Sequence, residues 1–215
     1  MNILALRERI SQAEQHETTE SILRAWLEER LPTLHPAITA VGEQEVEALM
    51  RFVRGYIGQV PDVIEAALGV ATQAHISPQL LPVMKVAETF FLQPPDLPSD
   101  HRGLLALLDE AYLAHRLLEE VNDRYLAHGG GQLVPLDTTR ASLIVHHLLE
   151  EDFANKLDAL VQVTVDGLAP DSVFHGPDFS EYKQRMNVED KRSLWQEWPC
   201  MSEQLGMEIR LRDIA

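Results

Sequence analysis

The stretch of sequence that decides the fold is AYLAHRLLEEVNDRYLAHGGGQLVPLDTTRASLIVHHLLEE, residues 111–151. It joins two long runs of helix-forming residues through three consecutive glycines and a short segment that contains one proline. Glycine commonly ends helices, and Asp137 is a residue type that caps the start of the next one. A connection this short predicts that the two helices, about residues 100–127 and 138–168, pack as antiparallel neighbours.

Each of these two helices carries an apolar stripe that polar residues interrupt. The first stripe consists of Leu104, Leu108, Ala111, His115, Leu118, Asn122 and Tyr125, and the second of Leu143, His146, Glu150, Phe153, Leu157 and Leu160. Apolar residues three to four positions apart lie on one side of a helix. We therefore expect both stripes to face the core, with their histidines and glutamates between the helices.

The rest of the chain is also predicted to be mainly helical. Further amphipathic segments cover residues 2–14, 18–31, 43–57, 61–75 and 77–91. After Pro170 the periodicity fades, which predicts an irregular C-terminal arm with a short helix near residues 191–198. Alternation in GMEIRLRDI, residues 206–214, indicates a final strand. The prediction is an all-α fold: a multi-helix bundle over residues 1–170, built around the long antiparallel hairpin, with the arm of residues 171–215 packed on it.

Composition narrows the classes of partner. The 215 residues include 34 acidic and 18 basic side chains, a formal net charge of -16. Such a chain repels phosphate backbones and anionic lipid, so we expect no nucleic-acid and no membrane partner. The single cysteine, Cys200, excludes a disulfide within the chain and a zinc site of several thiolates. With no signal-peptide pattern and no apolar run of about 20 residues, the expected location is the cytoplasm.

Four polar residues suggest a site: His115 in the first stripe, Glu119 beside that stripe, and His146 and Glu150 in the second. If the hairpin is centred on the glycine loop, His115 lies level with Glu150, and Glu119 lies level with His146. Imidazole and carboxylate ligands from facing helices hold iron, manganese or zinc in helical bundles. The alternative is a metal-free network of His–Glu hydrogen bonds that satisfies buried polar groups. Di-iron bundles use Glu-x-x-His, whereas the order here is His-x-x-x-Glu on both helices, which favours the metal-free network.

Three classes of function follow from these patterns. The sequence lacks GxSxG, HExxH, P-loop and EF-hand motifs, which leaves open whether the chain is an enzyme. The leading expectation is a protein that acts through protein–protein contacts, with a partner or with a second copy of itself. The alternatives are a metal-binding bundle that uses His115, Glu119, His146 and Glu150, and a small-molecule binder. The pocket of that binder would lie between the bundle and the arm segment from Ser172 to Tyr182.

Overall fold

The computed structural model describes residues 1–15, 19–41, 44–95, 101–185 and 199–210, and these residues are mostly helical. The described helices are α1 (Ile3–Glu14), α2 (Thr19–Arg30), α3 (Glu45–Gly58), α4 (Val60–Gln73), α5 (Ser77–Leu92), α6 (Leu104–Ala127), α7 (Thr139–Leu148), α8 (Glu151–Leu168), α9 (Asp171–Phe174), α10 (Pro177–Arg185) and α12 (Met201–Gln204). A short 3-10 turn, η1 (Leu31–Thr33), and two strands, β1 (Ile38–Ala40) and β2 (Met207–Ile209), complete the set. The predicted all-α multi-helix fold is confirmed.

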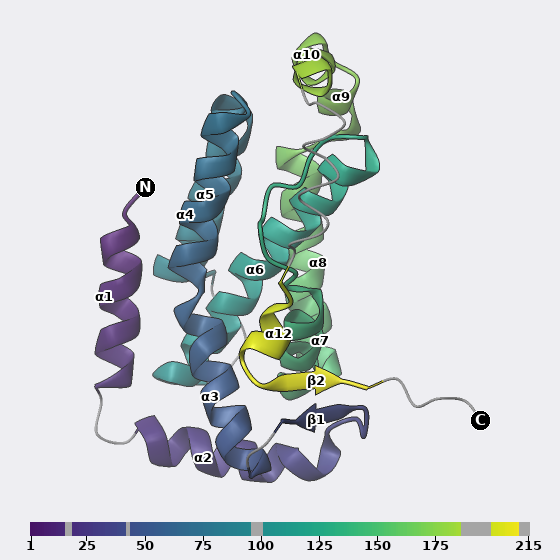
Figure 1. Ribbon diagram of the computed structural model, residues 1–215. Helices are drawn as coiled ribbons and strands as arrows, with labels where there is room; N and C mark the ends of the chain where they lie inside the picture. The colour runs from purple at the N-terminus through teal and green to yellow at the C-terminus, as the bar shows by residue number, and fades with distance from the viewer. Residues whose placement is uncertain (16–18, 42–43, 96–100, 186–198, 211–215) are drawn as a thin grey trace, which may run out of the picture.

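Helix α6 is the centre of the bundle, because α5 and α8 pack along it and α1, α2, α3, α4 and α7 also contact it. Figure 1 shows α1, α4 and α5 on one side of α6, with α7 and α8 on the other. Buried residues cover almost the whole circumference of α6 between Leu104 and Tyr125, including the polar residues Asp109, Glu110, His115 and Glu119. A polar group on a helix that is buried on all sides normally has a hydrogen-bond or ion-pair partner.

The predicted second long helix is wrong in one respect, because it is two helices. α7 ends at Leu148, Glu150 has a φ of 69°, and α8 begins at Glu151. Arg30 of α2 contacts the turn between α7 and α8. Its Nε donates to the Leu148 carbonyl at 2.9 Å, and its Nη2 lies 3.0 Å from a Glu150 carboxylate oxygen. An arginine at this position satisfies a carbonyl that the end of α7 leaves without an intrahelical donor.

The direction of each helix follows from its contacts with α6. Thr138, just before α7, hydrogen-bonds Glu119, whereas His146 near the end of α7 lies beside Tyr112. α7 is therefore antiparallel to α6, as predicted. α8 runs the other way: Asp158 contacts Tyr112, and Asp166 pairs with Arg124 three turns farther along α6. α8 is thus parallel to α6, and the antiparallel hairpin is confined to α6 and α7.

The turn also changes which residues of α7 and α8 are buried. Ile144, Val145 and Leu148 form the buried side of α7, whereas Leu143 of the predicted stripe is 47% exposed. In α8, Leu157 is buried as predicted. The predicted stripe assumed one continuous helix, and the break at Glu150 rotates the two halves relative to each other.

The described part of the C-terminal segment forms three short helices, α9, α10 and α12, and the strand β2. β2 pairs antiparallel with β1, with Ile38 opposite Ile209 and Ala40 opposite Met207. The final strand is confirmed, while β1 was not predicted. The arm is helical in α9 and α10 rather than irregular, and its Phe174 packs edge-on against Tyr125 of α6 at 5.4 Å between ring centres. The short helix predicted near residues 191–198 lies outside the described residues.

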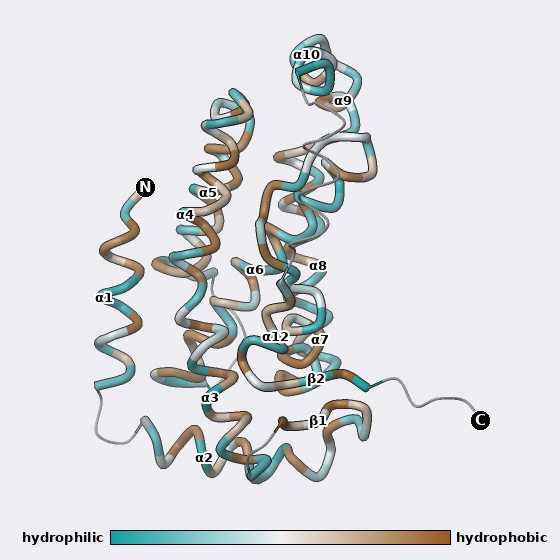
Figure 2. The backbone as a smooth tube through the Cα atoms, viewed as in Figure 1, coloured by the Kyte–Doolittle hydropathy of each residue, from teal (hydrophilic) through white to brown (hydrophobic). Residues whose placement is uncertain are grey.

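Hydropathy follows the amphipathic pattern that the sequence predicted. Figure 2 shows hydrophobic and hydrophilic residues alternating along most helices. Among the described residues, none of the helices combines the length and the apolar character needed to cross a membrane.

Candidate functional site

A polar pocket of about 230 Å³ opens between α6, α7 and α8. Its lining residues are Tyr112, Arg116 and Glu119 from α6, Thr139, Ser142, Leu143 and His146 from α7, and Asp158 from α8. The pocket exists because α8 turns back at Glu150 and returns along α6, so that three helices meet around it. It brings five ionisable side chains together in a bundle whose interior is otherwise mainly apolar.

Helix α6 contributes one polar face to this pocket. Tyr112, Arg116 and Glu119 are four and three residues apart, so their side chains project from the same side of the helix. Asp158 of α8 lies opposite them. Its carboxylate accepts a hydrogen bond from the Tyr112 hydroxyl at 3.0 Å and another from Arg116 Nε at 3.0 Å. These two donors hold the Asp158 carboxylate at the pocket wall, with 29% of its side chain still exposed.

His146 of α7 also approaches Asp158. Its Nε2 atom is 3.6 Å from Asp158 Oδ2 and 3.3 Å from the side-chain oxygen of Asn155. The imidazole ring centre is 6.3 Å from that of Tyr112. His146 therefore lines the pocket within reach of a carboxylate, but that carboxylate belongs to Asp158 rather than to Glu150.

Glu119 forms the inner end of the pocket. The residue is 8% exposed, and its carboxylate accepts from the Thr138 hydroxyl at 3.1 Å and pairs with Arg116 Nη1 at 2.9 Å. Burial raises the pKa of Glu119, and the Arg116 charge and the hydroxyls of Ser142 and Thr138 oppose that rise. The two carboxylates of the pocket thus have different surroundings: Glu119 is desolvated, whereas Asp158 reaches solvent.

Behind Glu119, a hydrogen-bonded layer connects the pocket to α3. The Tyr56 hydroxyl lies 3.2 Å from Ser142 Oγ, and His115 Nε2 lies 2.9 Å from the Tyr56 carbonyl. Because a carbonyl only accepts, Nε2 carries the imidazole proton. The other nitrogen, Nδ1, is buried with no hydrogen-bond partner, and burial lowers the pKa of His115 to about 4. His115 is therefore an uncharged core residue beneath the pocket and not part of its wall.

The structure separates the four residues predicted as metal ligands. Glu119 and His146 both line the pocket, and His115 lies one layer deeper. Glu150 is at the α7–α8 turn, where its side chain is 71% exposed and pairs with Arg30. Within the described ranges, no three histidine, cysteine, aspartate or glutamate side chains are arranged to hold a metal ion. The metal prediction therefore has no supporting arrangement in this part of the chain.

Sequence reasoning missed three ionisable residues of the pocket, Tyr112, Arg116 and Asp158. The spacing of Tyr112, Arg116 and Glu119 on one helical face was a usable signal, because a tyrosine and two charged residues interrupt an apolar run there. Asp158 had no such signal, since its approach to α6 depends on the reversal at Glu150. The position of α8 therefore had to come from the tertiary structure.

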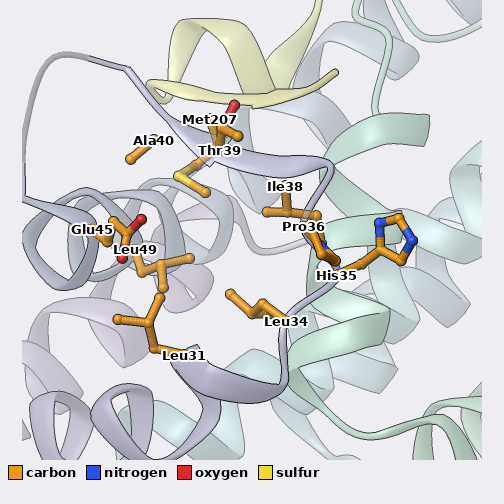
Figure 3. Close-up of a pocket in the computed structure, with 10 residues that line it drawn as sticks. All are labelled: Leu31, Leu34, His35, Pro36, Ile38, Thr39, Ala40, Glu45, Leu49 and Met207. Atoms are coloured by element: carbon orange, nitrogen blue, oxygen red, sulfur yellow. The ribbon is translucent and has the colours of Figure 1, made fainter. Parts of the chain in front are cut away.

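A second hollow, of about 210 Å³, lies beneath the two-stranded ribbon (Figure 3). Its lining residues are Leu31, Leu34, His35, Pro36, Ile38, Thr39, Ala40, Glu45, Leu49 and Met207. Most of these side chains are apolar, and Figure 3 shows Glu45 beside Leu49 at one wall. With two titratable lining residues, this hollow offers fewer groups for recognition or chemistry than the pocket between α6, α7 and α8.

Comparisons of the chain with protein-family models, with curated proteins and with solved structures find no match. The function is therefore argued from the geometry of the pocket.

Proposed function

We propose that the protein binds a small organic cation, such as a primary ammonium compound, in the pocket between α6, α7 and α8. The observation that carries this proposal is the excess of carboxylate there. Glu119 and Asp158 line the pocket with a single arginine, Arg116, and Glu120 lies 3.8 Å from the same guanidinium. The formal net charge of -16 adds a long-range field that attracts cations.

The hydrogen-bonding capacity of the pocket supports the same ligand class. Arg116 already directs Nε to Asp158 and Nη1 to Glu119, so its guanidinium is not oriented to clamp an anion. A carboxylate accepts about four hydrogen bonds, and Asp158 uses only part of this capacity on Tyr112 and Arg116. An ammonium group brings three donors, which suit Asp158 and the hydroxyl oxygens of Ser142 and Thr139. The volume of about 230 Å³ restricts the ligand to a few carbon atoms, because drug-sized sites run from about 300 Å³ upward.

Calorimetric titration with three matched probes tests the proposal: n-propylamine, propionate and 1-propanol, all near pH 7. We expect the amine to bind and the carboxylate and the alcohol not to bind. Asp158→Asn should weaken amine binding by about tenfold or more, because a charge-assisted hydrogen bond becomes a neutral one. Tighter binding of propionate than of propylamine would contradict the proposal.

Asp166→Asn is the matched control. Asp166 lies on the same helix and also pairs with an arginine, Arg124, but it is outside the pocket. This variant should bind propylamine as tightly as the parent protein. Equal losses in Asp158→Asn and Asp166→Asn would mean that the amine responds to overall charge and not to the pocket.

The protein contacts expected from the sequence stay a prediction. The most exposed large apolar side chains among the described residues are Leu4 and Val163, each 71% exposed. They lie on α1 and α8, at opposite sides of the bundle in Figure 1.

A further inference from the structure

A separate cavity of about 260 Å³ lies between the arm and the bundle, where the sequence predicted room for a small molecule. Ile76 and Gln79 line it from the start of α5, and Tyr125 lines it from the end of α6. On the arm side it is lined by α9, by α10 and by the turn between them, including Ser172, Val173 and Phe179. The cavity is therefore closed on one side by the bundle and on the other by the arm.

Aromatic rings form much of its surroundings. The Tyr125 ring lies 5.5 Å from that of Phe179 at 75° and 5.4 Å from that of Phe174 at 86°. Phe179 also lies 5.1 Å from Phe174, so the three rings form an edge-to-face cluster at the base of the arm. Apolar and aromatic walls of this kind favour a flat ring, which packs on them by offset or edge-to-face contact.

One buried polar group at this cavity lacks a partner among the described residues. The side-chain oxygen of Gln79 is buried and accepts no hydrogen bond. Tyr125 is 3% exposed and lines the cavity. Burial raises the pKa of Tyr125 to about 12, so the phenol keeps its proton and is able to donate at neutral pH. Buried polar groups in proteins normally have a partner, and a ligand hydroxyl would supply one here.

We propose that this cavity binds an uncharged ring compound that carries one hydroxyl group, a phenol or an aryl alcohol. The ring packs against Tyr125 and Phe179, and the ligand hydroxyl donates to the side-chain oxygen of Gln79. The cavity volume suits a single substituted ring rather than a drug-sized molecule. This site is independent of the cation pocket, because the two cavities share no lining residue.

Titration calorimetry and ligand-detected NMR with 4-methylphenol and 4-methylanisole test the proposal. The two probes have nearly the same shape, but only the phenol has a donor. We expect 4-methylphenol to bind the parent protein about three- to tenfold more tightly, which is the effect of one net hydrogen bond. Gln79→Leu removes the acceptor and should reduce this ratio to about one. Equal affinity of the parent protein for the two probes, or binding of neither, would overturn the proposal.

A matched pair of variants tests whether the ligand binds in this cavity. Ser172→Phe adds a ring at the cavity wall and should abolish binding of 4-methylphenol. Ser180→Phe adds the same ring at an exposed position of α10 that does not line the cavity, and it should leave binding unchanged. Parental affinity in Ser172→Phe would refute this location. Asp158→Asn should bind the phenol normally, so that failure of this site is distinguishable from failure of the cation pocket.

Discussion

Replacing His115 by glutamine should remove a defined part of the pH dependence of stability. The ring is 1% exposed, and its pKa falls from 6.5 to about 4 because the charged form would be desolvated. The unfolded chain therefore binds a proton at a higher pH than the folded chain does. The stabilisation from the neutral ring is fully present above pH 6.5 and is lost as the pH falls toward 4.

The size of the effect follows from the two pKa values of His115. Proton linkage gives a loss of about 2 kcal/mol in the free energy of unfolding between about pH 7.5 and about pH 5. Glutamine does not titrate, and its side-chain amide is able to donate to the Tyr56 carbonyl in place of Nε2. The glutamine variant should therefore lose about 2 kcal/mol less than the parent over this interval.

Urea denaturation of both proteins at the two pH values measures this difference. Burial also raises the pKa values of Glu110 and Glu119, but these groups are present in both proteins and cancel in the comparison. His175→Gln, at an exposed position, is the control and should keep the parental pH dependence. If His115→Gln also keeps it, the imidazole is protonated in the folded protein and the account of its burial is wrong.

Two further predictions concern the core and the α7–α8 turn. Leu108→Ala and Leu157→Ala should each lower the free energy of unfolding by ~2–5 kcal/mol, because both side chains are completely buried. Chemical denaturation measures this loss. A loss under about half a kcal/mol in both variants would contradict the packing of α6 and α8. Glu150→Gly should raise stability by about 1 kcal/mol, because glycine relieves the strained positive φ, whereas Glu151→Gly at the start of α8 should lower it by about 0.5–1 kcal/mol. Thermal melts of this pair give the two signs, and equal losses in both would show that Glu150 is not strained.

The helices could be predicted from the sequence because helix formation is local. Each backbone hydrogen bond joins residues four apart, and the apolar spacing that marks a helix lies within the same few turns. For this reason the segments now seen as α1 to α6 were located almost to their ends. The strand at Met207–Ile209 was recognised for a similar reason, from its alternation. Its partner strand β1 was not recognised, because a three-residue strand has little sequence pattern of its own. In addition, β1 and β2 are separated by most of the chain.

The candidate site was predicted in part. Glu119 and His146 belong to one pocket, as their predicted positions level with each other across the hairpin indicated, and His115 lies directly beneath it. Glu150 was assigned to the same site because a continuous helix would have carried it there. Neither glycine nor proline marks the break at Leu149 and Glu150, so local sequence offered no reason to end the helix.

The sequence by itself determined the fold class, the limits of most helices and the antiparallel approach of α7 to α6. Only the tertiary structure decided that α8 turns back along α6 and that Asp158, rather than Glu150, faces Tyr112, Arg116 and His146. The turn is held by Arg30, more than a hundred residues earlier in the chain, which binds the end of α7 and the Glu150 carboxylate. A contact between residues so distant in sequence leaves no local periodic signal, so the reversal of α8 that forms the pocket could not be predicted from the sequence.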